Sequence, residues 1–134
     1  MQAALRQVWQ QLAAHRDPES GVWTGELSSS ALSTATAVSA LAFVSQHGGD
    51  TSNDRLIDAG IAWLVDQQNA DGGFGDTPLS HSNIATTMLT TAAIHACGRE
   101  TQFADSLVAA QSYIDAAGGI AGLRTRYGTD KTFA

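Results

Sequence analysis

The chain has 134 residues, of which 43% are hydrophobic and only 15% charged, and its formal net charge is −6. The 7 lysines and arginines are scattered, so they cannot neutralise a row of phosphates, and nucleic acid is excluded as a partner. No apolar run approaches the roughly 20 residues that a membrane-spanning helix needs.

Low charge also indicates that some faces of the protein are covered by another domain, another chain or a lipid surface. The N-terminal segment is amphipathic and has no unbroken apolar stretch, unlike a signal peptide. We expect one domain over residues 1–134, located in the cytoplasm, with peripheral membrane contact left open for a longer parent protein. The lone Cys97 excludes a disulfide framework and is predicted to be a small buried thiol.

The first predicted helix carries an apolar stripe at helical spacing, formed by Leu5, Val8, Trp9 and Leu12, and ends at a polar break over residues 17–21. The second spans residues 28–45 and is crowded with Ala, Ser and Thr. Glycine-rich breaks follow at residues 48–50, 71–73, 98 and 118–119.

The third predicted helix begins near Asn53 or Asp54, which are good capping residues. Its stripe consists of Leu56, Ile57, Gly60 and Leu64. The fourth spans residues 80–97, again rich in Ala, Ser and Thr, with Ser80 or Ser82 as its expected cap. The fifth carries Phe103, Leu107, Ala110 and Ile114, after which a turn at residues 118–120 starts a return from Gly122.

Helices two and four are predicted to be inner helices, packed on both sides. Small residues suit places where helices approach closely, and a Ser or Thr hydroxyl can bond back into its own helix. Helices one, three and five are then outer helices. The tryptophans Trp9, Trp23 and Trp63 are expected in the core or between repeats.

The inner and outer helices form a repeating unit. Gly21 aligns with Gly73, and Leu27 with Leu79, in each case 52 residues further along. Periods of this size are typical of stacked or closed arrays of helix hairpins. We predict approximate repeats over residues 1–49, 53–98 and 102–134, the third incomplete. Because such an array cannot bury its last face without a cap, we expect the chain to be part of a longer protein.

The most informative segment is GIAWLVDQQNADGGF, residues 60–74, which sets Trp63, Gln68, Gly72 and Phe74 at fixed spacing. A helix end leaves carbonyls unpaired, and glycine permits the left-handed residue that reverses the chain. A glutamine amide can donate and accept in that reversal. The aromatic residue is expected to cover the joint between adjacent outer helices, so we predict a structural role without chemistry.

Two further turns carry parts of the same pattern. The first contains Gly21 and Trp23, after a helix that is longer by about three residues and whose glutamine is out of register. The third contains Gly118 and Gly119 and is shortened.

This spacing resembles the QW repeat of the terpene cyclase and squalene–hopene cyclase family, which belongs with the prenyltransferase and squalene oxidase repeats. Phe74 stands where that repeat usually has Trp, and Ala59 where it has Lys or Arg. The resemblance covers essentially the whole chain and is to the N-terminal segment of such cyclases. It implies an all-α fold of helix-hairpin tandem repeats forming a partial α/α toroid, or α/α barrel.

The resemblance also implies a function for the parent protein. Class II cyclases of triterpenoid biosynthesis are isomerases that protonate an alkene or epoxide with an Asp-X-Asp-Asp acid. This chain has no such motif, and Ser33 or its neighbour stands where family members often place a glutamate. We expect a scaffold segment that is inactive alone, without catalytic residues, cofactor or metal. Its expected partners are the rest of the parent chain or a second subunit, and a polyprenoid lipid as the parent's substrate.

Two alternatives stay open. The first is a non-catalytic helical toroid used for binding or assembly. The second is a zinc enzyme of the protein prenyltransferase type, suggested by Cys97, His81 and His95. The two histidines are about four helical turns apart, too far for ligands that must converge on one ion.

Other polar residues have plain structural interpretations. Asp50, Asp71 and Asp76 are expected to make hydrogen bonds within turns. A threonine row is expected to pack helices together, with a polar cavity as the alternative; it consists of Thr86, Thr87, Thr90 and Thr91.

Overall fold

The structure is a computed structural model that describes residues 2–23, 25, 28–49 and 51–128. The described residues form helices and no named strand, which confirms the predicted all-α fold class. The helices are α1 (Gln2–Ala14), α2 (Ala31–Gly48), α3 (Asp54–Asp66), α4 (Ile84–Ala96), α5 (Ala104–Ala116) and α6 (Gly119–Tyr127). None of them is long and apolar enough to cross a bilayer.

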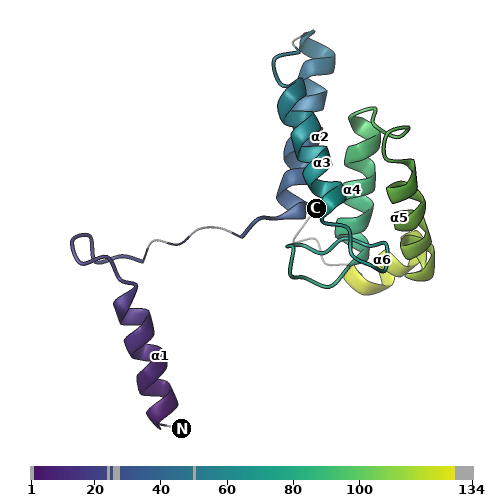
Figure 1. Cartoon of the computed structure of the whole chain (residues 1–134). Helices are drawn as coiled ribbons and strands as arrows, with labels where there is room; N and C mark the ends of the chain where they lie inside the picture. Colours follow the sequence, from purple (N-terminus) through teal and green to yellow (C-terminus); the bar gives the residue numbers. More distant parts are fainter. Residues whose placement is uncertain (1, 24, 26–27, 50, 129–134) are drawn as a thin grey trace.

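Two layers of helices form the body of the protein (Figure 1). The inner helices α2 and α4 lie side by side, α3 packs on α2, and α5 packs on α4. The prediction of packing on both sides holds for α4, which contacts both α2 and α5, and for α2, which contacts both α3 and α4. Helix α2 still leaves Leu32, Phe43 and Val44 exposed.

Several hydroxyl groups of the inner helices bond back into their own helices, as the sequence predicts. Thr36 and Ser39 donate to the carbonyls of Leu32 and Ala35 in α2. Thr91 donates to the carbonyl of Thr87 in α4. Among the described residues, the buried hydroxyls of Ser45 in α2 and Thr90 in α4 have no hydrogen-bond partner.

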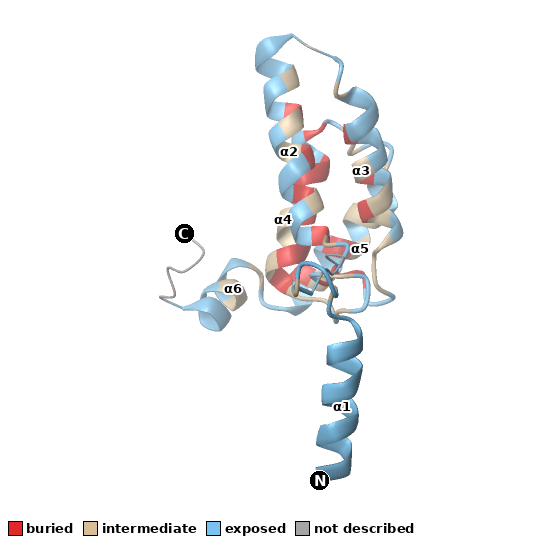
Figure 2. Cartoon of the chain, turned by 90° about the vertical axis from the view of Figure 1, so that its left-hand side faces the viewer, coloured by how far each residue is buried: buried red, intermediate tan, exposed pale blue. Residues whose placement is uncertain are grey.

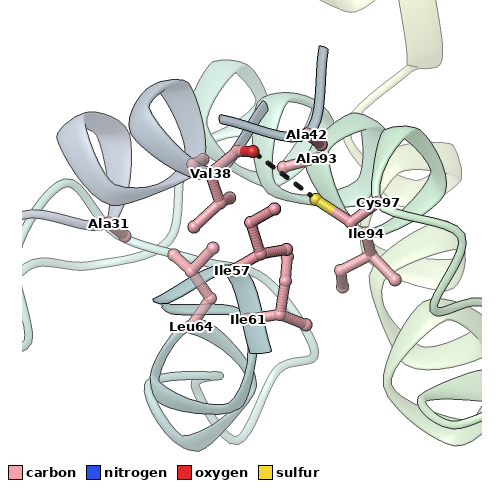
Figure 3. Close-up of a cluster of buried hydrophobic side chains, with 10 residues drawn as sticks. Ala31, Val38, Ala42, Ile57, Ile61, Leu64, Ala93, Ile94 and Cys97 are labelled. Atoms are coloured by element: carbon pink, nitrogen blue, oxygen red, sulfur yellow. Dashed lines mark hydrogen bonds between the residues drawn. The ribbon is translucent and has the colours of Figure 1, made fainter. Parts of the chain in front are cut away.

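The core lies where α2, α3 and α4 meet (Figure 3). Its buried members are Ala31, Ala35, Val38, Ala42, Ile57, Ile61, Leu64, Ala93, Ile94 and Cys97. Gly60 brings α3 close to α2, because a Cβ atom at that position would lie 2.4 Å from Val38 Cγ1. Cys97 is a buried thiol, as predicted, with Sγ 3.7 Å from the carbonyl oxygen of Val38. Burial raises the pKa of this thiol.

The helix starts differ from the predicted ones. Ser30 caps α2 by accepting a bond from the Ser33 amide. Asn83, and not Ser80 or Ser82, caps α4 by accepting a bond from the Thr86 amide. The serines are engaged in the preceding loop, so the inner helices begin later than the composition suggests. Helix α6 begins at Gly119 and not at the expected Gly122, because Gly118 with φ +88° caps it.

Helix α1 lies apart from the other helices (Figures 1 and 2), and none of its residues is buried. Trp9 and Trp23 are both more than half exposed, which contradicts their expected places in the core or between repeats. Trp63 is partly buried against the core, in agreement with that expectation. Trp9 is exposed because nothing in the described structure lies on the apolar stripe of α1.

This difference between helices can be measured. Leu64→Ala is expected to lower the free energy of unfolding by about 2–5 kcal/mol, because a fully buried side chain leaves a cavity. Leu12→Ala, the matched change in α1, is expected to change it by less than about 0.5 kcal/mol. Urea denaturation followed by circular dichroism checks both, and equal losses would show that α1 is packed.

Candidate functional site

The candidate site is the loop between α3 and α4, residues 67–83, which we call the glutamine turn. The Gln68 side-chain nitrogen, Nε2, donates to the Gly72 carbonyl at 2.8 Å and to the Ser106 carbonyl at 2.9 Å. Gln68 therefore joins the end of α3 both to its own turn and to the neighbouring outer helix α5. The sequence predicted one donor and one acceptor role, whereas both of these bonds use the amide nitrogen as donor.

Two glycines seat the turn against α5. Gly72 has φ +83°, and a Cβ atom there would lie 2.5 Å from the Ala109 carbonyl oxygen. A Cβ atom on Gly73 would lie 2.6 Å from Ser82 Cβ and 3.0 Å from a ring carbon of Tyr113. A side chain at either position would push the turn away from the outer helix.

Phe74 fixes the turn to the inner helix. Its ring is fully buried, its amide donates to Thr87 Oγ1 at 2.9 Å, and its carbonyl accepts from the Asn83 amide at 3.0 Å. The described contacts of its backbone are thus with the start of α4. Its expected position over the joint between outer helices stays a prediction; in the described bonds Gln68 makes that link.

A side-chain network closes the turn. Asn69 Nδ2 donates to the Ser80 carbonyl and to Ser82 Oγ. Asp71 Oδ1 accepts from Ser82 Oγ at 2.7 Å and from the Gly73 amide at 3.0 Å. The hydrogen bond from Ser82, the larger cause, and that from the Gly73 amide lower the pKa of Asp71. The role of Asn69 was not predicted, although an Asn just after a helix is a common sign of such turns.

Asp76 links the turn to both inner helices. Its carboxylate accepts from the Thr86 hydroxyl and from Asn83 Nδ2, and these two bonds lower its pKa, with the Thr86 bond the larger cause. Its backbone carbonyl accepts from the Ala31 amide at the start of α2, at 3.0 Å. The predicted turn bonds of Asp71 and Asp76 are therefore confirmed; Asp50 lies outside the described residues.

The first turn is built differently. Gly21 has φ +71°, and its amide donates to the Asp17 carbonyl. Trp23 Nε1 donates to the Leu12 carbonyl at 2.6 Å, and the Arg16 guanidinium lies 5.5 Å from the Trp23 ring centre. Trp23 thus satisfies an end carbonyl of α1.

The third turn is tighter. Gly118 and Gly119 both have positive φ, and α6 starts directly after Gly118. The Gly118 amide donates to the Asp115 carbonyl, and the Gly122 amide donates to the Gly118 carbonyl. The reversal is therefore made by the backbone.

The threonine row of α4 serves packing. Thr86, Thr87 and Thr90 are buried, and Thr87 also bonds the Asn83 carbonyl. Thr91 is partly exposed and borders a hollow of about 440 Å³ between α4, α5 and α6. That hollow is lined by Met88, Thr91, Ala92, His95, Gln111, Ile114, Asp115, Gly119 and Ile120.

Comparison with known proteins identifies the family. The family model of the squalene-hopene cyclase N-terminal domain matches residues 5–127. The chain belongs to the squalene-hopene cyclase family. It is 33% identical over 104 residues to the squalene hopane cyclase afumA of Aspergillus fumigatus. The match covers 76% of this chain and spans 13% of that protein's length. No solved structure shows significant similarity.

The cysteine and histidines of the zinc alternative do not converge in this squalene-hopene cyclase N-terminal domain. In the described part of the chain, no three His, Cys, Asp or Glu side chains are grouped to hold a metal ion. Cys97 is buried beside Val38, whereas His95 lies 3.3 Å from Glu100. His81 is exposed in the glutamine turn, before α4 begins. The arrangement can hold hairpins in place, and its carboxylates serve as hydrogen-bond acceptors.

The lowered pKa values make a pH prediction. A carboxyl group whose pKa is lower in the folded state stabilises the fold above its unfolded pKa, about 4, and this contribution is lost as the pH falls through the folded pKa. Thermal midpoints are therefore expected to fall as the pH decreases from about 5 to about 2. In Asp71→Asn and Asp76→Asn the midpoint should already be lower at pH 7 and should decrease less on acidification. Asp105→Asn, an exposed change on α5, should retain the full decrease; equal curves for all variants would refute the role of these bonds.

Proposed function

We propose that this chain is the N-terminal scaffold segment of a squalene–hopene-type class II cyclase and is inactive alone. The parent protein would cyclise a linear polyprenoid after protonating an alkene. The family membership supports the parent activity, and the 33% identity to a protein named squalene hopane cyclase supports the substrate class. The partner in this proposal is the rest of the parent chain or a second subunit. In this proposal the chain is located in the cytoplasm, and the parent protein contacts a membrane peripherally.

The proposal of a scaffold role rests on how this chain uses its carboxylates. Protonating carbon requires a carboxylic acid that holds its proton at the working pH. Asp71 and Asp76 instead accept hydrogen bonds that lower their pKa values, so both are ionised at neutral pH. The sequence has no Asp-X-Asp-Asp motif that could replace them.

The positions of the predicted turn residues fit the same role. In the glutamine turn, Gln68, Gly72 and Phe74 connect α3, α5 and α4 through backbone bonds and close contacts. We interpret these turns as QW-type turns that hold the hairpins of a toroid together. The approximate repeats 1–49, 53–98 and 102–134 belong to this proposal.

A non-catalytic binding or assembly module is the second candidate. It is favoured by the absence of the acid motif and by Ser33 or its neighbour at the position where, by the resemblance, family members often place a glutamate. Ser33 is exposed near the start of α2, where it donates its amide to Ser30 Oγ. This candidate predicts that no cyclase motif accompanies the region in its coding sequence.

Incubation with squalene tests the proposal. The purified 134-residue chain is expected to give no cyclic product by mass spectrometry. The product of the whole coding sequence is expected to carry an Asp-X-Asp-Asp motif and to form a cyclic triterpene. Changing the central Asp of that motif to Asn should abolish the product. A cyclic product from the chain alone would refute the scaffold role, and inactivity of the whole product would favour the binding module.

A further inference from the structure

Asp71 and Gly72 form the only Asp-Gly pair in the sequence, and the sequence has no Asn-Gly pair. An aspartate that precedes glycine is especially prone to isomerise, because glycine has no Cβ atom to keep its amide nitrogen away from the aspartate side chain. The pair lies in the glutamine turn, where Asp71 is exposed and Gly72 is buried. Asp71 also lines an open hollow of about 390 Å³ on that turn, so water reaches its carboxylate.

The isomerisation joins the Gly72 amide nitrogen to Asp71 Cγ. The nitrogen loses its proton and attacks Cγ, which expels one carboxyl oxygen as water and closes a five-membered succinimide ring. A second water molecule then opens the ring at one of its two carbonyls. Opening at Cγ restores aspartate, whereas opening at the former backbone carbonyl leaves isoaspartate, whose main chain runs through Cβ and Cγ. One water leaves and one returns, so no atom is oxidised or reduced.

The folded turn opposes each part of this reaction. The Gly72 amide, which must lose its proton, donates to the Asn69 carbonyl at 2.9 Å. Asp71 Oδ1 is held by the Ser82 hydroxyl at 2.7 Å and by the Gly73 amide at 3.0 Å. These bonds, that from Ser82 more than that from Gly73, lower the pKa of Asp71, and an ionised carboxylate reacts with an amide far more slowly than the protonated acid. The pair is therefore protected while the turn is closed.

We propose that Asp71 and Gly72 form a modification site at which isoaspartate arises when the glutamine turn opens. The closed turn suppresses the reaction, and each opening frees the Gly72 amide and the Asp71 carboxyl group at the same time. The site needs only water as a reactant. The proposal holds for a cyclase scaffold and for a binding module alike, because it depends on this loop alone.

Isoaspartate would make the opening permanent. Its main chain is longer by one methylene group, next to Gly72, where a single added Cβ atom would already lie 2.5 Å from the Ala109 carbonyl oxygen. Its Cγ carbonyl belongs to the main chain, so that oxygen is no longer free to reach both Ser82 and the Gly73 amide. The modified turn therefore no longer fits against α5, and the bond from Gln68 to that helix is lost.

Ageing of the full chain tests the proposal. The protein is incubated for weeks at neutral pH, once folded in buffer and once unfolded in concentrated guanidinium chloride. It is then digested with a protease that cleaves before aspartate but not before isoaspartate. Cleavage releases residues 66–70 and 71–75, whereas isomerisation of Asp71 leaves residues 66–75 uncut. Mass spectrometry measures the uncut fraction relative to the unaged chain. The proposal predicts isomerisation slower by about tenfold or more in the folded chain.

Matched controls separate the turn from the local sequence. In guanidinium chloride, Asp105 should isomerise more slowly than Asp71, because the residue after it, Ser106, has a Cβ atom. In the folded chain, Ser82→Ala removes one bond to Asp71 and should speed isomerisation by about fivefold or more. Ser112→Ala, whose hydroxyl bonds within α5, should leave the rate unchanged. Circular dichroism checks that both variants are folded.

Equal rates in the folded and unfolded chains would overturn the proposal, because the turn would then give no protection. Equal rates in folded Ser82→Ala and Ser112→Ala would overturn it as well. So would a rate at Asp71 no higher than that at Asp105 in the unfolded chain. If Ser82→Ala does not fold, the comparison of the folded with the unfolded wild-type chain decides.

Discussion

The side-chain amide of Gln68 is the interaction on which the arrangement of the hairpins depends. It bonds a carbonyl of its own turn, that of Gly72, and a carbonyl of α5, that of Ser106. A chain reversal leaves helix-end groups without partners, and a buried unpaired carbonyl is costly. One side chain therefore fixes both where the chain turns and where the next outer helix lies.

The remaining contacts of the glutamine turn follow from that position. With Gly72 held against Ala109, Phe74 is buried and its amide reaches Thr87 of α4. Farther along, the carbonyl of Asp76 receives the first amide of α2. A single loop thus contacts both inner helices and both packed outer helices. Its two carboxylates have lowered pKa values because they accept bonds in this network, and a scaffold needs acceptors of that kind.

The sequence predicts the elements better than their contacts. Helical spacing located the helices, and their Ala, Ser and Thr content identified α2 and α4 as inner helices, because these signals are local. Gln68 and Gly72 were identified by spacing and by the resemblance. The cap of α4 was misplaced, since Asn83 competes with two nearby serines that the turn itself engages.

The errors concern residues whose surroundings come from distant parts of the chain. Trp9 looked like a core residue because its stripe matches those of α3 and α5, yet a stripe cannot reveal whether a partner helix is present. Asn69 was missed because its partners, Ser80 and Ser82, lie across the loop. The α/α toroid class, in contrast, agrees with the family match over residues 5–127.

The most direct test removes the amide of Gln68. Gln68→Ala leaves two carbonyls without this donor and is expected to lower the free energy of unfolding in urea by about 1–3 kcal/mol. It should also speed hydrogen exchange at the start of α5 and in residues 69–74. Gln67→Ala, the neighbouring change whose side chain bonds only Asp66 in the described structure, should alter stability by less than about 0.5 kcal/mol. Equal small effects of both changes would contradict the account, because the hairpins would then be held together without the Gln68 bonds.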